Sequence, residues 1–104
     1  MRVSYSTSRL EKILTNERLI KRHYTKQHIK LRNRLSELRA AISLADIPSD
    51  PPPRRHKLTG SLKECWGIDI SRNFRIIIKP QGSYDEHDLS TITDCIIIDI
   101  EDYH

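Results

Sequence analysis

Ionisable side chains stand where predicted strands begin and end, and one such strand reaches the last residues of the sequence. Tyr103 and His104 follow residues 95–100, the most apolar run of the chain, which has the composition of a buried strand. His56 begins another strand-like segment, and Arg75 lies within a third. General acid–base chemistry requires an imidazole or a phenol on a rigid support, and a strand provides one. We therefore expect one small sheet to gather all four side chains.

Such a set matches the chemistry of RNA cleavage without a metal ion. A base removes the proton of the ribose 2′-hydroxyl, a cation stabilises the extra negative charge of the transition state, and an acid protonates the departing 5′-oxygen. Histidine can serve as acid or base, contributing roughly 10²–10⁴-fold in rate for each role. Arginine binds phosphate through two hydrogen bonds and keeps its charge, and lysine supplements it as a point charge. Lys57, next to His56, is the candidate for that supplementary cation.

Each residue also has an ordinary structural explanation when it is taken alone. His56 suits the exposed start of a strand, and Arg75 suits a surface ion pair with Asp69 across a hairpin. Tyr103 suits the edge of a core, and His104 suits a chain end in solvent. The catalytic interpretation therefore depends on the four residues coming together.

The charge is distributed unevenly along the chain. The net charge is +4. Residues 1–80 carry all 18 Lys and Arg with seven acids, a net charge of +11, whereas residues 81–104 carry seven acids and no Lys or Arg, a net charge of −7. A positive body of this size attracts polyanions, of which nucleic acid is the commonest, although a solvated basic helix gives the same pattern.

The composition is that of one small domain in a reducing compartment. A chain of 104 residues can bury one modest core, so we expect a single domain over residues 1–104. No apolar stretch is long enough to span a bilayer, and no apolar leader begins the sequence. Cys65 and Cys95 lie far apart without paired ligand spacing, which predicts two buried thiols and no zinc site. We expect a cytoplasmic protein without metal or other cofactor.

The N-terminal half predicts a short strand followed by helices. Residues 2–6 can form the strand, with Val3 and Tyr5 on one face. Residues 8–24 predict a helix that divides near Thr15 and Asn16, with Asn16 capping the second part. The next helix carries a continuous apolar stripe at spacings of three and four residues. Its members are Tyr24, His28, Leu31, Leu35, Leu38 and Ile42.

The C-terminal half predicts strands. The prolines at residues 51–53 stop any helix and predict an extended path. Residues 56–70 then read as a strand, residues 71–73 as a tight turn and residues 74–79 as the returning strand. A long polar loop precedes the last strand. The predicted order is β-α-α-β-β-β, an α+β domain with the N-terminal helices on one face of a small, mainly antiparallel twisted sheet.

Four segments resemble a known family of toxins. They are Arg-His-Lys-Leu-Thr-Gly at 55–60, Cys-Trp-Gly-Ile-Asp-Ile at 65–70, Asn-Phe-Arg-Ile at 73–76 and Asp-Ile-Glu-Asp-Tyr-His at 99–104. Together they resemble the HigB-like branch of the RelE/ParE superfamily, the toxins of bacterial type II toxin–antitoxin pairs. The resemblance covers residues 44–104, and the order of the N-terminal helices also fits. It implies a microbial-RNase-like fold with a concave basic active face.

The resemblance also implies an activity, partners and residue roles. RelE and HigB members cut mRNA in the ribosomal A site without a metal. By position, His56 and His104 look like the proton-transfer residues, Arg75 looks like the cation at the transition-state phosphate, and Tyr103 would position the RNA. A HigA-like helix-turn-helix antitoxin, the ribosome and mRNA are the implied partners. The remaining RNA-binding candidates are basic residues in or near these segments: Arg54, Arg55, Lys63 and Arg72.

One position departs from the family pattern. Relatives often carry lysine immediately before the glycine of the His-x-Leu-x-Gly piece, where this chain has Thr59. In a regular strand Lys57 shares a face with Thr59, so Lys57 is the expected substitute for that cation. Two other functions stay open at this point. One is a gyrase-poisoning toxin like ParE, and the other is a non-enzymatic RNA-binding module or degenerate toxin.

Overall fold

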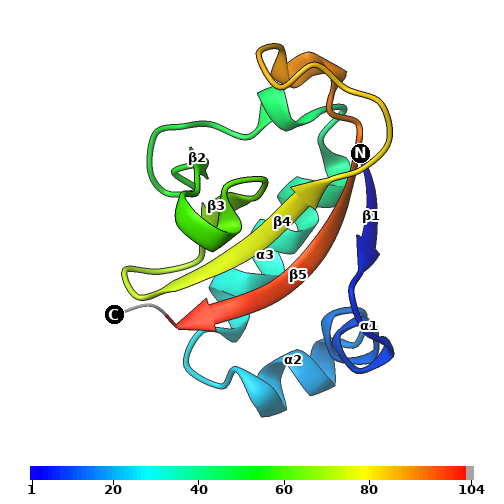
Figure 1. Ribbon diagram of the computed structural model, residues 1–104. Helices are drawn as coiled ribbons and strands as arrows, with labels where there is room; N and C mark the ends of the chain where they lie inside the picture. Colours follow the sequence, from blue (N-terminus) through cyan, green and yellow to red (C-terminus); the bar gives the residue numbers. More distant parts are fainter. Residues whose placement is uncertain (103–104) are drawn as a thin grey trace.

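The computed structural model describes residues 1–102, which form three helices and one five-stranded sheet (Figure 1). The helices are α1 (Ser8–Leu14), α2 (Glu17–His23) and α3 (His28–Ala40). The strands are β1 (Arg2–Tyr5), β2 (His56–Lys57), β3 (Trp66–Asp69), β4 (Phe74–Pro80) and β5 (Asp94–Asp102). Within these residues, no helix is both long and apolar enough to cross a membrane.

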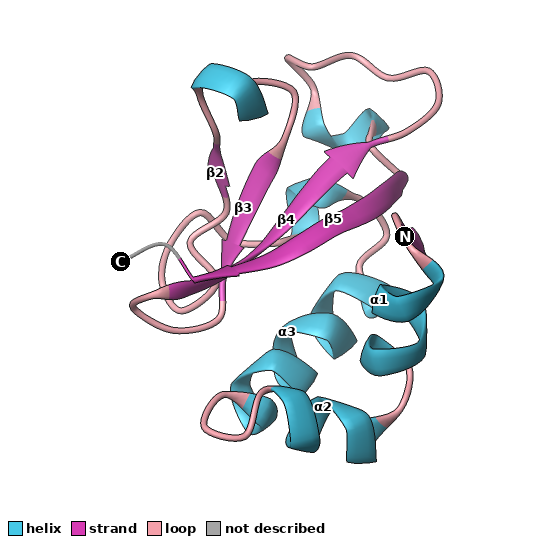
Figure 2. Ribbon diagram, turned by 60° about the horizontal axis from the view of Figure 1, so that its bottom comes forward, coloured by secondary structure: helices cyan, strands magenta, loops and turns pink. Residues whose placement is uncertain are grey.

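The sheet has the strand order β1-β5-β4-β3-β2. Strand β1 runs parallel to β5, and the other neighbours are antiparallel. All three helices lie on one side of this sheet, and its other face is left open (Figure 2). The predicted α+β class, with helices on one face of a mainly antiparallel sheet, is confirmed. The sheet gains a strand because a 3₁₀ turn at Gly60–Leu62 divides the segment expected as one strand into β2 and β3.

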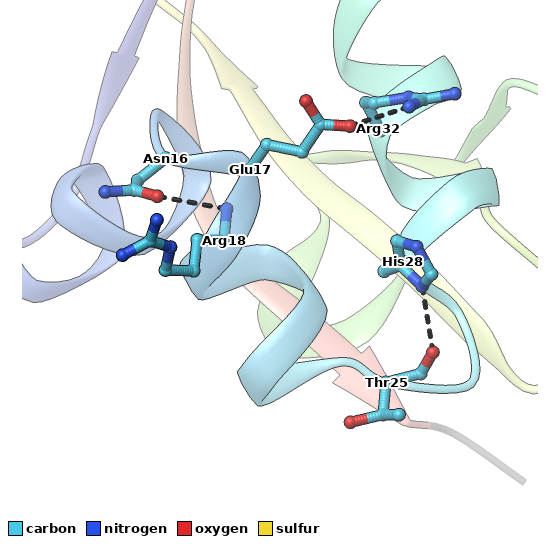
Figure 3. A network of polar contacts seen from close by, with 6 residues as sticks. All are labelled: Asn16, Glu17, Arg18, Thr25, His28 and Arg32. Carbon is cyan, nitrogen blue, oxygen red and sulfur yellow. Dashed lines mark hydrogen bonds and ion pairs between the residues drawn. The ribbon is translucent and has the colours of Figure 1, made fainter.

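The boundary between α1 and α2 lies where the sequence predicts. Asn16 separates α1 from α2, and its Oδ1 accepts hydrogen bonds from the backbone N–H groups of Arg18 at 3.0 Å and Leu19 at 3.3 Å (Figure 3). Glu17 then binds Arg32 of α3 with 2.6 Å between carboxylate and guanidinium. The cap and the ion pair fix the start of α2 against α3.

The apolar stripe of the third helix is shorter than the sequence predicts. Leu31, Leu35 and Leu38 are fully buried, but Tyr24 belongs to the end of α2 and Ile42 is 80% exposed. The helix ends before Ile42 because Ala41 is extended and the Asp46 carboxylate accepts the Ile42 N–H at 2.8 Å. A local cap therefore overrides the periodic pattern.

The three prolines also take a different course from the expected extended path. Residues 51–53 form a turn, which Arg54 closes by donating its backbone N–H to the Asp50 carbonyl at 3.1 Å. Arg54 has φ of 40°, in the left-handed region. Proline restricts φ but leaves ψ free, so consecutive prolines can turn as well as extend. The chain leaves this turn directly into β2.

The two faces of the sheet carry separate apolar clusters. Alternate residues of β3, β4 and β5 pack against the helices, among them Ile68, Ile76 and Ile97. On the open face, Leu58, Cys65 and Ile77 form a smaller cluster. Both cysteines are free and buried, as predicted. The open face is therefore apolar at one end, and its remaining positions are available for polar side chains.

Burial of Cys95 makes the fold sensitive to alkaline pH. Burial, with a smaller contribution from the Asp94 carboxylate, raises the pKa of the Cys95 thiol from 9.0 to about 12. The unfolded thiol loses its proton first, so this contribution to stability is complete below pH 9 and is lost as the pH rises towards 12. We expect the free energy of unfolding to fall by up to about 1.4 kcal/mol per pH unit in that range. Urea titrations at several pH values test this, and Cys95→Ala should show a shallower decline; an unchanged slope would contradict it.

Candidate active site

The open face of the sheet carries polar side chains from four strands. In the register, His56 of β2 lies opposite Gly67 of β3, and Arg75 of β4 lies between Asp69 of β3 and Glu101 of β5. Because side chains alternate along a strand, His56, Asp69, Arg75 and Glu101 share one face. The strand spacings place the Cα atoms of His56 and Arg75 about 12 Å apart. Because the Arg75 side chain is long, its guanidinium and the His56 imidazole can both reach one nucleotide bound between them.

The imidazole of His56 contacts a backbone carbonyl through one nitrogen and packs over Gly67. Its Nδ1 lies 2.7 Å from the carbonyl oxygen of Arg54. A carbonyl only accepts hydrogen bonds, so Nδ1 carries the proton and Nε2 is the atom left for proton exchange. A Cβ on Gly67 would lie 2.9 Å from both Cε1 and Nε2 of this ring, closer than real contacts allow. Gly67 therefore makes the room that the ring occupies, as a lone glycine in a strand often does.

Arg54 contacts His56 through its backbone carbonyl and contacts Asp69 of β3 through its side chain. The guanidinium donates Nε to Asp69 Oδ2 at 2.6 Å and a terminal nitrogen to Oδ1 at 3.3 Å. The backbone N–H of Asp69 in turn donates to the Pro53 carbonyl at 2.7 Å. The segment that presents His56 is thereby tied to β3 from both sides. The structure brings Arg54, an RNA-binding candidate from the sequence, next to the imidazole.

Arg75 is oriented by a carboxylate on the neighbouring strand. Its Nε donates to Glu101 Oε1 at 2.8 Å, and the same oxygen lies 2.5 Å from a terminal guanidinium nitrogen. The Arg75 side chain is 16% exposed, so its charge lies partly out of water, where it interacts more strongly with an anion. Glu101 thus fixes the orientation of the guanidinium. A bound phosphate can replace one of its two contacts with Glu101.

Lys57 does not join this group. It lies opposite Trp66, whereas its neighbour His56 lies opposite Gly67, so the two consecutive side chains point to different faces. The Lys57 ammonium lies 5.6 Å from the centre of the Trp66 ring and donates to the Lys63 carbonyl. The chain stays extended through Thr59, so Lys57 remains on the face away from His56.

The three remaining basic candidates differ in their surroundings. Arg55 donates to the Ile47 carbonyl at 2.6 Å, and its guanidinium lies 5.8 Å from the Trp66 ring centre, which makes it part of the scaffold. Lys63 is exposed after the 3₁₀ turn. Arg72 is exposed in the turn between β3 and β4, close in sequence to Arg75. Of these three, the structure leaves Arg72 best placed at the end of the open face.

The predictions for Tyr103 and His104 fall outside the described residues and stay predictions. The last described residues of β5, Glu101 and Asp102, lie opposite Arg75 and Phe74. Within residues 1–102, no group of three or more His, Cys, Asp and Glu side chains could hold a metal ion.

Sequence reasoning missed three contributors to this arrangement. Gly67, Glu101 and the carbonyl of Arg54 shape the site, yet none of them carries an obvious catalytic signature. The isolated glycine inside an alternating strand was the available signal for Gly67. The carbonyl of Arg54 carries no signal in the sequence, because its direction depends on a backbone angle.

Comparison with known proteins supports the fold assignment. The sequence matches no protein-family model and no curated protein. Among solved structures, the chain is similar to a chain of the YoeB-YefM complex from Staphylococcus aureus, with a TM-score of 0.53 and 13% sequence identity. The alignment covers 100% of this chain and 97% of that chain, so the likeness concerns the whole domain. The likeness shows that this chain shares the fold of that chain.

Proposed function

We propose that this protein is the toxin of a type II toxin–antitoxin pair and that it cuts mRNA on the ribosome without a metal ion. The observation that carries the proposal is the placement of His56. Its Nδ1 is tied to a carbonyl, and its ring lies on the same open face as Arg75. The RelE-type fold, the basic body of the chain and the four resembling segments support the same activity.

In the proposed reaction, His56 exchanges a proton with the RNA through Nε2. The Arg54 carbonyl keeps the ring in the orientation and tautomer that this step requires. Arg75 binds the phosphate and stabilises the charge that develops on it, exchanging part of its contact with Glu101. On the family pattern, His104 would supply the second proton-transfer group, and Tyr103 would position the RNA. Lys57 is left out of this set because it lies opposite Trp66.

The proposal includes an antitoxin partner and a cytoplasmic site of action. The similar structure is a complex named for two proteins, which supports a dedicated partner for this chain as well. On the family pattern that partner is a HigA-like helix-turn-helix protein. A ribosome-dependent enzyme would act in the cytoplasm, where translating ribosomes are found.

Mapping the 5′ ends of cellular mRNA after brief expression of the chain tests this activity. We expect new ends within translated regions, and we expect purified protein to cut mRNA on programmed ribosomes. Intact mRNA together with DNA breaks and an SOS response would instead establish a gyrase poison. Intact mRNA and intact DNA with retained RNA binding would leave a non-enzymatic module. Either of these two outcomes overturns the proposal.

A further inference from the structure

A hollow lined by basic side chains lies beside the turn that joins β3 to β4. It is a depression of about 290 Å³ between α3, the proline turn and this hairpin turn. In Figure 1 the hairpin turn lies at the same end of the sheet as the last described residues of β5. Five of the eight residues that line the hollow are polar or charged. The lining residues with side chains relevant here are Lys30, Arg34, Asp69, Ser71 and Arg72.

The depression is lined by more cations than anions, and two of these cations have no hydrogen-bond or ion-pair partner within residues 1–102. Among the lining residues, Lys30, Arg34 and Arg72 are set against one acid, Asp69, which already binds Arg54, and Arg34 is itself paired with Glu37 outside the lining. Within residues 1–102, the structure gives the side chains of Lys30 and Arg72 no hydrogen-bond or ion-pair partner. Both side chains belong to exposed residues and come from different elements, α3 and the hairpin turn. Two flexible cations facing one hollow can converge on a single anion.

Arg34 adds a less mobile charge to the wall of this depression. Its side chain is only 11% exposed. One terminal nitrogen donates to both carboxylate oxygens of Glu37, at 2.8 and 2.9 Å, and its Nε is buried without a hydrogen-bond partner among the described residues. A guanidinium that is buried and only partly paired raises the positive potential around it. Because Glu37 offsets part of this charge, binding of an anion depends mainly on Lys30 and Arg72.

The depression borders the two strands that carry part of the candidate active site. Asp69 lines it and lies directly opposite Arg75 in the register. Arg72 stands in the short turn between these two strands. A chain of phosphates that crosses the open face at Arg75 can therefore pass Arg72 and reach the hollow.

We propose that this depression binds a backbone phosphate of the RNA, distinct from the phosphate at which the chain is cut. The identification of RNA as the source of that phosphate rests on the proposed function, whereas the anion site itself does not. Lys30 and Arg72 are the primary ligands, and Arg34 supplies the background charge. The contact would recognise the backbone without regard to base, and it would set the register of the RNA relative to His56.

Binding of a non-cleavable RNA tests the site. The probe is a short RNA with 2′-methoxy groups, and the test variant is Lys30→Ala/Arg72→Ala. The control is Lys12→Ala/Arg18→Ala, which removes the same charge from exposed residues of α1 and α2 that do not line the hollow. We expect the test variant to bind roughly tenfold more weakly than the control. Its plot of log K against log salt should be shallower by about 0.7, the loss of one single-strand phosphate contact. Equal affinity and equal slope in the two variants would overturn the proposal.

Inorganic phosphate separates this site from the proposed enzyme activity. In amide NMR spectra, phosphate should shift Ser71, Arg72 and Asn73 in the native chain and in His56→Gln, but not in Lys30→Ala/Arg72→Ala. Shifts that centre on His56 and Arg75 alone would contradict the second site. If RNA is bound in the hollow but never cut, the proposed enzyme activity fails and the phosphate site stands. If RNA is cut and the two double variants bind alike, the phosphate site fails alone.

Discussion

Replacing Arg75 with alanine will lower mRNA cleavage on programmed ribosomes by roughly 10²–10³-fold, the usual effect of removing one preorganised contact to transition-state charge. No other described cation occupies its position in the register between Asp69 and Glu101. Arg75→Lys should recover part of the loss, because lysine keeps the charge but not the two-pronged geometry. Single-turnover cleavage measures the effect directly.

The same substitution should leave the fold nearly intact. Glu101 is 31% exposed, so water can solvate its carboxylate when the guanidinium is removed. We expect the free energy of unfolding to fall by about 1 kcal/mol, near the upper end for exposed pairs. Lys79→Ala is the matched control, because it removes a β4 cation whose carboxylate partner, Glu64, lies 3.4 Å away. Full activity in Arg75→Ala, or an equal loss in Lys79→Ala, would remove Arg75 from the mechanism.

Replacing His56 with alanine should lower cleavage by roughly 10²–10⁴-fold. A methyl group added at Gly67 should also lower cleavage, because it displaces the His56 imidazole. The new Cβ in Gly67→Ala would meet the imidazole at 2.9 Å and the Leu58 side chain at 3.2 Å. The imidazole is the mobile end of a side chain, so the ring will move aside and lose its bond to the Arg54 carbonyl. We expect at least about a tenfold loss of activity, with a much smaller effect on stability.

A double-mutant cycle identifies the route of this effect. If Gly67→Ala acts by displacing the imidazole, it should have little further effect on cleavage in a His56→Ala background. Thermal unfolding of all four proteins controls for damage to the sheet. An equal loss of activity from Gly67→Ala with and without the imidazole would mean that the glycine serves the fold and not His56.

Local rules in the sequence account for most of the secondary structure. The spacing of Leu31, Leu35 and Leu38 predicts a buried helical stripe, and Asn16 predicts the start of α2. The alternation from Trp66 to Ile70 predicts the face of β3 that meets the helices. Each of these inferences depends on neighbours within one or two turns or along one strand, so the sequence contains the information needed.

The expectations that failed were those in which a short local contact overrides a pattern. Ile42 continues the apolar spacing, but the carboxylate of Asp46 ends the helix before it. The prolines turn because the backbone of Arg54 closes on Asp50. Lys57 was expected to join the catalytic group, but the register places its side chain on the face opposite His56. In the first two cases, the pattern was present and a hydrogen bond or turn limited its length.

By itself, the sequence determined the class of fold and the identities of the candidate groups, two of which, His56 and Arg75, lie on one described face. Only the tertiary structure decided how each group is held. Pairing of β4 with β5 gives Arg75 the carboxylate of Glu101, and pairing of β2 with β3 gives His56 the space above Gly67. The left-handed turn at Arg54 supplies the carbonyl that orients the imidazole. The physical reason is that strand register and backbone angles join residues far apart in the chain, which composition and periodicity do not encode.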